Sequence, residues 1–128
     1  MPRTTAARAA ALALALAATA AAWIAGAANG PSRGDPAAGK ALFVKNCILC
    51  HKANGTGGMK ITGNPSPDWT DAKTWADAKR STDDYFRDCI TNGKVKSGMV
   101  AWGKSGQIKP AEIENLIAYI HTFAPKKK

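Results

Sequence analysis

The sequence has few cysteines, and their number is odd. Three are present among 128 residues: Cys47, Cys50 and Cys89. Disulfide pairing alone would leave at least one thiol over in an oxidising compartment, so a simple disulfide framework is excluded. No cysteine lies near the apolar N-terminal segment, which argues against a lipoprotein anchor.

Acidic residues are also scarce. The sequence has nine Asp and Glu and 18 Lys and Arg, which gives a net charge of +9. Nucleic acid is one partner for such a basic surface. The N-terminal segment indicates export, however, and an exported protein meets membranes and other exported proteins instead. We therefore expect no nucleic-acid partner. A positive surface would instead speed and orient encounters with acidic proteins.

Strand patterns and catalytic groupings are both missing. No stretch alternates polar and apolar residues, no internal repeat is visible, and the periodic segments have the spacing of helices. These segments are 35–45, 68–79, 81–92 and 110–123. Ser81 is expected to cap the third of them, with Asp84 as its box-like partner. Since the periodic segments are helical, we expect an all-α protein. No nucleophile–base pair and no paired acidic residues suggest catalysis, so we do not expect an enzyme.

The N-terminal segment resembles a signal peptide. Arg3 and Arg8 precede an apolar run that ends in Ala25-Gly26-Ala27, a typical cleavage site, so residues 1–27 are predicted to be removed and the protein to be periplasmic. The alternative is a retained membrane anchor, because residues 9–28 lack charge and are long enough to span. Membrane contact is expected only in that case.

The remaining chain divides into a flexible lead-in (28–34), one folded domain (35–124) and a basic tail (125–128). The glycine-rich loops 53–67 and 94–107 are unusually long for a compact domain unless they have a function. We therefore expect the chain to wrap around a bound group near residue 50.

The stretch CILCH, residues 47–51, is the candidate site for that group. In a helical turn Cys47, Cys50 and His51 point the same way. Two thiols at this spacing can bond to the two vinyl groups of a haem, and the histidine beside them can reach its iron. A zinc site would need a second, separated pair of ligands, and only Cys89 is available. Thiol–disulfide chemistry would be expected in a βαβ context, which is missing.

These residues, with further matching segments, resemble the small monohaem c-type cytochromes of the mitochondrial and bacterial cytochrome c superfamily. The segments are GKALF (39–43), CILCH (47–51), DWTDAKTW (68–75), STDDYFRDCITNGK (81–94), GMVAWG (98–103) and LIAYI (116–120). The resemblance implies the cytochrome c fold, with three to four helices and long loops wrapped around one covalently bound haem c. It also implies a crossing of the first and last helices, with Gly39 and Phe43 against Tyr119.

Met99 is the predicted sixth ligand of the iron. It lies in a glycine-flanked loop that can cross the far haem face, and the resemblance places the axial methionine there. Met59, eight residues after His51, is expected to pack instead. A lysine or water on the iron is the alternative. A thioether in this position raises the potential and blocks small ligands.

Other conspicuous residues are expected to be structural. Cys89 is interpreted as a small buried hydrophobe and His121 as a surface histidine. Three tryptophans are expected to pack in the core, and Trp102 is the candidate donor to a haem propionate. The family commonly has a proline soon after the attachment site whose carbonyl accepts the proximal imidazole N–H. Here the first proline after the attachment site, Pro65, comes late, so the sequence does not predict which group accepts the hydrogen bond from the His51 imidazole.

The sequence thus predicts a periplasmic one-electron carrier with a single His51/Met99-ligated haem c. It would shuttle electrons by outer-sphere transfer between redox proteins with acidic docking surfaces. Two alternatives remain open. One is a cytochrome subunit of an oxidase or dehydrogenase complex, and the other is a ligand-binding or peroxidatic haem protein with a labile sixth ligand. The electron donor, the electron acceptor and the potential are not specified by the sequence.

Overall fold

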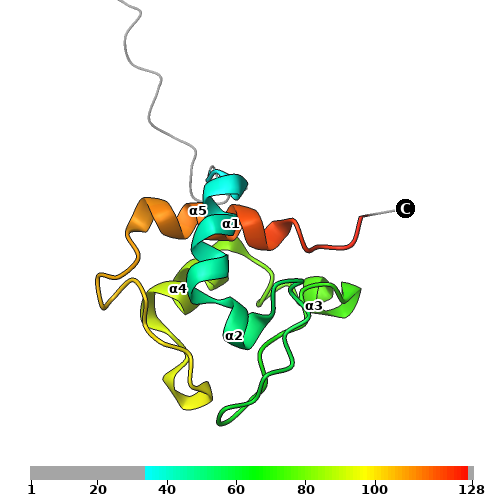
Figure 1. The fold of residues 1–128 in the computed structure, drawn as a ribbon. Coiled ribbons are helices and arrows are strands. Elements are labelled where there is room, and N and C mark those ends of the chain that lie inside the picture. The colour runs from blue at the N-terminus through cyan, green and yellow to red at the C-terminus, as the bar shows by residue number, and fades with distance from the viewer. Residues whose placement is uncertain (1–33, 127–128) are drawn as a thin grey trace, which may run out of the picture.

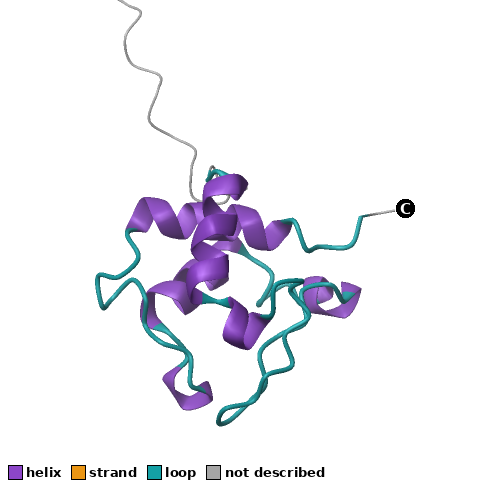
Figure 2. Ribbon diagram, in the orientation of Figure 1, coloured by secondary structure: helices purple, strands orange, loops and turns teal. Residues whose placement is uncertain are grey.

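Helices and long loops make up the whole of residues 34–126, which are the part of the chain that the computed structural model describes (Figures 1 and 2). The helices are α1 (Pro36–Asn46), α2 (Ile48–His51), α3 (Ala72–Ala76), α4 (Asp83–Asn92), the 3-10 helix η1 (Val95–Ser97) and α5 (Pro110–His121). The described residues form no β-strand, and Lys94 and Met99 pair as an isolated bridge. The all-α prediction is confirmed. The expected signal peptide lies outside the described residues.

Helix α1 starts as its sequence predicts. The Asp35 carboxylate accepts the Ala37 N–H at 2.8 Å, and Pro36 occupies the first turn, where its missing N–H costs nothing. At the other end, the Cys47 N–H donates to the Phe43 carbonyl at 2.8 Å. Cys47 therefore joins α1 almost directly to α2, and α2 ends at Lys52, whose φ is 57°.

The first and last helices cross closely, as the resemblance implied (Figure 1). At the crossing, a Cβ added to Gly39 would lie 1.9 Å from the Asn115 carbonyl oxygen, so the two backbones touch where only glycine fits. The Asp35 N–H donates to Asn115 Oδ1 at 2.8 Å. The Phe43 ring meets Tyr119 edge-on, with centroids 5.3 Å apart.

A single core lies beneath this crossing. It combines the apolar stripe of α5 with the inner face of α4 and one residue each from α1 and two loops. The buried members are Phe43, Trp69, Phe86, Cys89, Ile90, Ile108, Ile113, Leu116, Ile117 and Ile120. The buried members from α4 and α5 recur at helical spacing, as expected for one face of each helix. Cys89 is a buried thiol among them, as expected.

The predicted cap of α4 is wrong by one residue. Thr82 caps the helix, because its backbone is extended and its hydroxyl accepts the Tyr85 N–H at 3.1 Å. The hydroxyl of Ser81 instead donates to the Asp77 carbonyl at 2.8 Å, which removes it from the helix end. Asp84 does not complete a capping box, and its carboxylate binds Arg87.

Two side-chain pairs tie α4 to α5. The Arg87 guanidinium donates to both carboxylate oxygens of Glu114, at 2.6 and 3.1 Å. His121 Nε2 lies 2.6 Å from Asp83 Oδ1, and its ring is half-buried beside Trp75. His121 is therefore part of the packing between helices, whereas the sequence predicted a surface position. No helix within residues 34–126 is both long and apolar enough to cross a membrane.

Candidate cofactor site

Helix α2 brings together three of the four predicted site residues. The N–H groups of Cys50 and His51 both donate to the Cys47 carbonyl, at 3.3 and 2.9 Å, so the three residues form one tight turn. All three side chains are half-buried, and both thiols are free. This is the helical geometry in which side chains at i, i+3 and i+4 point the same way.

His51 presents a neutral imidazole with an unpaired nitrogen. Its ring stacks on Trp69, with centroids 4.4 Å apart and planes 8° from parallel, and it also packs near Phe43. Burial lowers the pKa of His51 to about 4, so the ring is uncharged at neutral pH and keeps a lone pair for a metal. Its Nδ1 is buried without a hydrogen-bond partner. A buried polar atom without a hydrogen-bond partner costs free energy, unless a bound group interacts with the ring and compensates for it.

The Cys47 thiol is held in the protonated form. Burial, and then the neighbouring Cys50, raise the pKa of Cys47 to about 12. A thiol in this environment is a poor nucleophile at neutral pH and a poor match for a redox dithiol, whose reactive cysteine has a lowered pKa. The thiol–disulfide alternative is therefore disfavoured.

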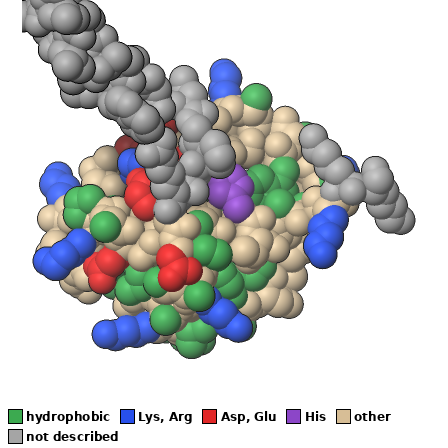
Figure 3. Space-filling model, turned by 90° about the horizontal axis from the view of Figure 1, so that it is seen from above, with side chains coloured by type: hydrophobic (Ala, Val, Ile, Leu, Met, Phe, Trp, Pro, Cys, Tyr) green, Lys and Arg blue, Asp and Glu red, His purple; other side chains and the backbone are tan. Residues whose placement is uncertain are grey.

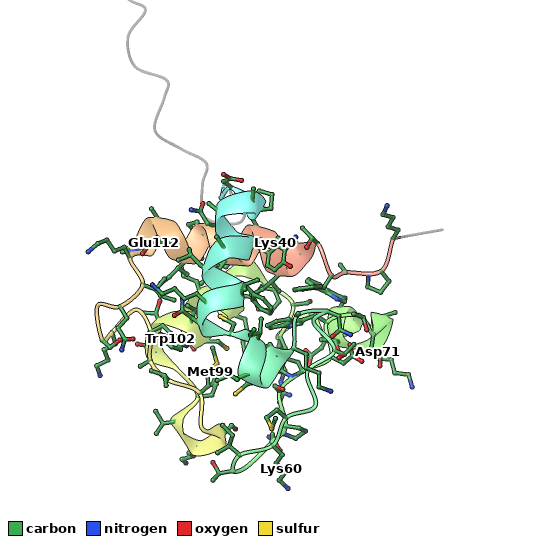
Figure 4. The ribbon with its side chains drawn as sticks, in the orientation of Figure 1. Lys40, Lys60, Asp71, Met99, Trp102 and Glu112 are labelled. Carbon is green, nitrogen blue, oxygen red and sulfur yellow. The ribbon has the colours of Figure 1, made fainter. Side chains whose placement is uncertain are left out.

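Met99, the predicted sixth ligand, lies on the segment between α4 and α5 (Figure 4). Its side chain is half-buried and packs against the same core cluster as Cys47 and Trp102. The expectation that Met59 packs is wrong, because this residue is 45 % exposed and belongs to a surface loop. Lys94, one candidate for a lysine ligand, has its ammonium 3.3 Å from the Asp88 carboxylate.

This donor set fits a haem attached through two thioethers. Two free thiols and a neutral imidazole share one turn, and a thioether lies on a separate loop against the same core. Zinc fits less well, because no group of three or more His, Cys, Asp or Glu among the described residues is placed to hold a metal ion. Cys89, the remaining thiol, is 8 % exposed in the core.

Sequence reasoning missed the contacts between the loops around the site. The Trp75 indole N–H donates to the Trp69 carbonyl at 2.6 Å and so steadies the ring that stacks on His51. The Ser66 hydroxyl donates to the Cys50 carbonyl at 2.6 Å. The loop 53–67 and the helical segment 68–79 were predicted, but no local pattern indicates which carbonyl a side chain from either will reach. The role of Trp102 as a propionate donor stays a prediction.

Comparison with known proteins places these observations in a family context. The sequence model of the family described as “Cytochrome C oxidase, cbb3-type, subunit III” matches residues 34–120. The cbb3-type cytochrome c oxidase subunit FixP of Bradyrhizobium sp. is 32% identical over 93 residues, which are 73% of this chain and 29% of FixP. Subunit CcoP of Azospirillum brasilense is 31% identical over 86 residues, 66% of this chain and 29% of CcoP. The chain thus spans about 29% of the length of these relatives.

Among solved structures, the fold is similar to that of the KustC0563 c-type cytochrome. The TM-score is 0.53 at 20% identity, and the match covers 68% of this chain and 98% of the other. At that identity the likeness concerns the fold alone. It agrees with the arrangement of helices and long loops that the sequence predicted.

Proposed function

The chain belongs to the family of cbb3-type cytochrome c oxidase subunit III, a family of c-type cytochrome domains, and from this premise we propose that it transfers electrons one at a time through a single covalently bound haem c. One observation carries the proposal. Two free thiols and a neutral, half-buried imidazole occupy a single turn, and the buried Nδ1 of that imidazole has no hydrogen-bond partner.

Four residues would hold the cofactor. Cys47 and Cys50 would form the thioether bonds, and His51 and Met99 would bind the iron. A bound haem supplies a one-electron redox centre whose potential is raised by His/Met ligation. Trp69 stacks on the His51 ring and Phe43 packs near it, so the imidazole is orientated before any ligand binds. The thioether of Met99 would exclude oxygen and other small ligands from the iron.

The names of the relatives support a role as an oxidase subunit more than a role as a free electron carrier. The sequence alone predicted a periplasmic electron carrier, with a cytochrome subunit of an oxidase or dehydrogenase complex as one alternative. The relatives are named as subunits of cbb3-type cytochrome c oxidases, which supports the second of these. We therefore propose that the domain passes electrons towards a terminal oxidase on the periplasmic side, with residues 1–27 as a cleaved signal peptide or a retained anchor.

The distribution of charge supports an acidic redox partner. No Asp or Glu occurs in 36–67 or 89–111, the two stretches that contain all four proposed ligands. The lysines of these stretches are Lys40, Lys45, Lys52, Lys60, Lys94, Lys96, Lys104 and Lys109. The nine acids lie at or beyond the ends of these stretches. In Figure 3, Lys and Arg side chains lie around the periphery of the face shown. Such a surface attracts acidic proteins.

Covalent attachment is the first test. The full chain is produced together with haem-ligation machinery, denatured, and extracted with acidified acetone. We expect the pigment to remain with the protein, and Cys50→Ala to weaken the attachment to a single thioether. Cys89→Ala is the matched control, because it removes the third thiol from the core without touching CILCH. Release of the pigment from the parent protein would overturn the proposal.

The choice between subunit and carrier is tested by purification. The full chain is isolated from gently solubilised cells at low and high salt, and its haem-containing partners are identified. An oxidase that stays bound at high salt supports the subunit. A monomeric protein that exchanges electrons rapidly with soluble partners would instead support the carrier.

A further inference from the structure

We propose that residues 59–66, a loop that we call the brace, hold Met99 in position for the cofactor. The inference rests on the proposed function, because it takes Met99 to be the iron ligand. The brace connects two segments that have to stay in register at such a site: the turn with the attachment thiols, and residues 94–99, which we call the Met99 loop. Figure 4 shows Met99 beside α2 and Lys60, in the brace, at the lower edge of the molecule.

The base of the brace is fixed to the attachment turn. The Ser66 hydroxyl donates to the Cys50 carbonyl at 2.6 Å and accepts the Met59 N–H at 3.1 Å. Backbone bonds from Gly58 to Ser66 and from Ser66 to Met59, both 2.9 Å, close the base as a narrow hairpin-like loop. Any movement of α2 is therefore transmitted to the brace.

The tip of the brace is fixed to the Met99 loop. The Thr62 hydroxyl donates to the Lys96 carbonyl at 2.8 Å. Next to this bond, a Cβ added to Gly98 would lie 3.0–3.1 Å from side-chain carbons of Ile61, so the Ile61 side chain covers Gly98. The two loops approach each other at the bottom of Figure 1, opposite the crossing of α1 and α5.

The Met99 loop needs such support because little of it is regular. It contains one turn of 3-10 helix, and its backbone closes on itself through two hydrogen bonds of 3.1 Å between Lys94 and Met99. Gly98, just before the ligand, has a φ of 86°. Val95 and Lys96 at its tip are exposed. Thr62 and Ile61 contact the loop immediately before Met99, where a small movement would displace the thioether.

Thr62 and Ile61 are thus positioning residues, which act on the iron through Met99. Without the brace, the Met99 loop would move away more often, and the iron would lose its sixth ligand for a larger fraction of the time. This fraction is measurable, because carbon monoxide binds to the reduced iron only when the thioether has left.

The experiment uses the full chain with its haem attached. We expect Thr62→Val to bind carbon monoxide about fivefold faster when reduced, which is the effect of one lost hydrogen bond of ordinary strength. In the oxidised protein, the sulfur-to-iron charge-transfer band should weaken. Thr62→Ser keeps the hydroxyl and should restore both signals. Ser66→Ala, which releases the base of the brace, should change them in the same direction as Thr62→Val.

Thr122→Val is the matched control. The Thr122 hydroxyl also donates to a backbone carbonyl, that of Tyr119 at 2.6 Å, but it lies at the end of α5. This variant should bind carbon monoxide at the parental rate. If Thr62→Val and Ser66→Ala behave like Thr122→Val while Met99→Ala opens the iron, the brace inference is overturned and the ligand assignment stands. If Met99→Ala itself leaves the rate unchanged, the ligand assignment fails first.

Discussion

The buried Nδ1 of His51 is the most informative single atom in the structure. Leaving such a group without a partner costs about 1–3 kcal/mol, yet the ring is held firmly against Trp69. The sequence predicted His51 as a ligand from its position in CILCH, but it could not predict this environment. Trp69 comes from a distant loop, and the contact depends on how loops 53–67 and 68–71 close over α2.

At the residue scale, Met99→Ala should lower the reduction potential and open the iron to carbon monoxide. Loss of the thioether removes the ligand that favours the reduced state, and the drop should be a substantial part of the roughly 0.8 V range that axial ligands span. Potentiometric titration measures the first effect and stopped-flow spectroscopy the second. Met59→Ala removes an exposed methionine and should change neither. An unchanged potential in Met99→Ala would mean that another group binds the iron.

At the scale of elements, the predictions that succeeded depend on local rules. The N-cap Asp35 with Pro36, and the periodic stripe of α5, are encoded by neighbours in sequence, and both helices start where expected. The start of α4 was misplaced because Ser81 and Thr82 are both suitable N-caps, and the Asp77 carbonyl, four residues before Ser81, accepts the Ser81 hydroxyl and leaves Thr82 as the cap. The 3-10 helix η1 and the brace were missed because they depend on contacts between loops.

The crossing of α1 and α5 gives a prediction at this scale. Gly39→Ala places a methyl group against the Asn115 backbone, which cannot move aside as a flexible side chain would. The two helices must separate, so we expect a loss of about 1–3 kcal/mol in the free energy of unfolding. Denaturant titration of the haem-loaded protein measures it. Lys40→Ala, at the next and exposed position of α1, should leave the stability within about 0.5 kcal/mol. Equal stabilities in the two variants would contradict the close approach.

At the scale of the whole molecule, electrostatics should govern association. Without Arg3 and Arg8, which lie in the predicted signal peptide, 16 Lys and Arg stand against nine Asp and Glu, a net charge of +7. The rate of electron transfer to an acidic redox protein should therefore fall about tenfold or more between low and physiological ionic strength. Reversing two charges in the acid-free stretches, Lys60→Glu with Lys96→Glu, should slow the reaction at low salt. The control is Lys73→Glu with Lys79→Glu, which changes the net charge equally within the acid-containing stretch. If both pairs of substitutions slowed the reaction equally, the rate would depend on net charge alone and not on the lysines of the acid-free stretches.

The processing of the N-terminus is a second prediction at this scale. If residues 1–27 are a signal peptide, the mature chain begins at Ala28, and its intact mass equals 101 residues plus one haem. Mass spectrometry of the periplasmic fraction measures this directly. A full-length chain found with the membranes would show that the segment is retained as an anchor.

The crossing of α1 and α5 also determines where this domain can be joined to others. Residues 34 and 126, the ends of the described chain, lie on the half of the molecule with the two crossed helices, away from the brace and the Met99 loop (Figure 1). Extra polypeptide at either end would therefore join the molecule on that half. An arrangement of this kind suits a module that can be fused in tandem, and relatives more than three times the length of the matched segment have room for such neighbours.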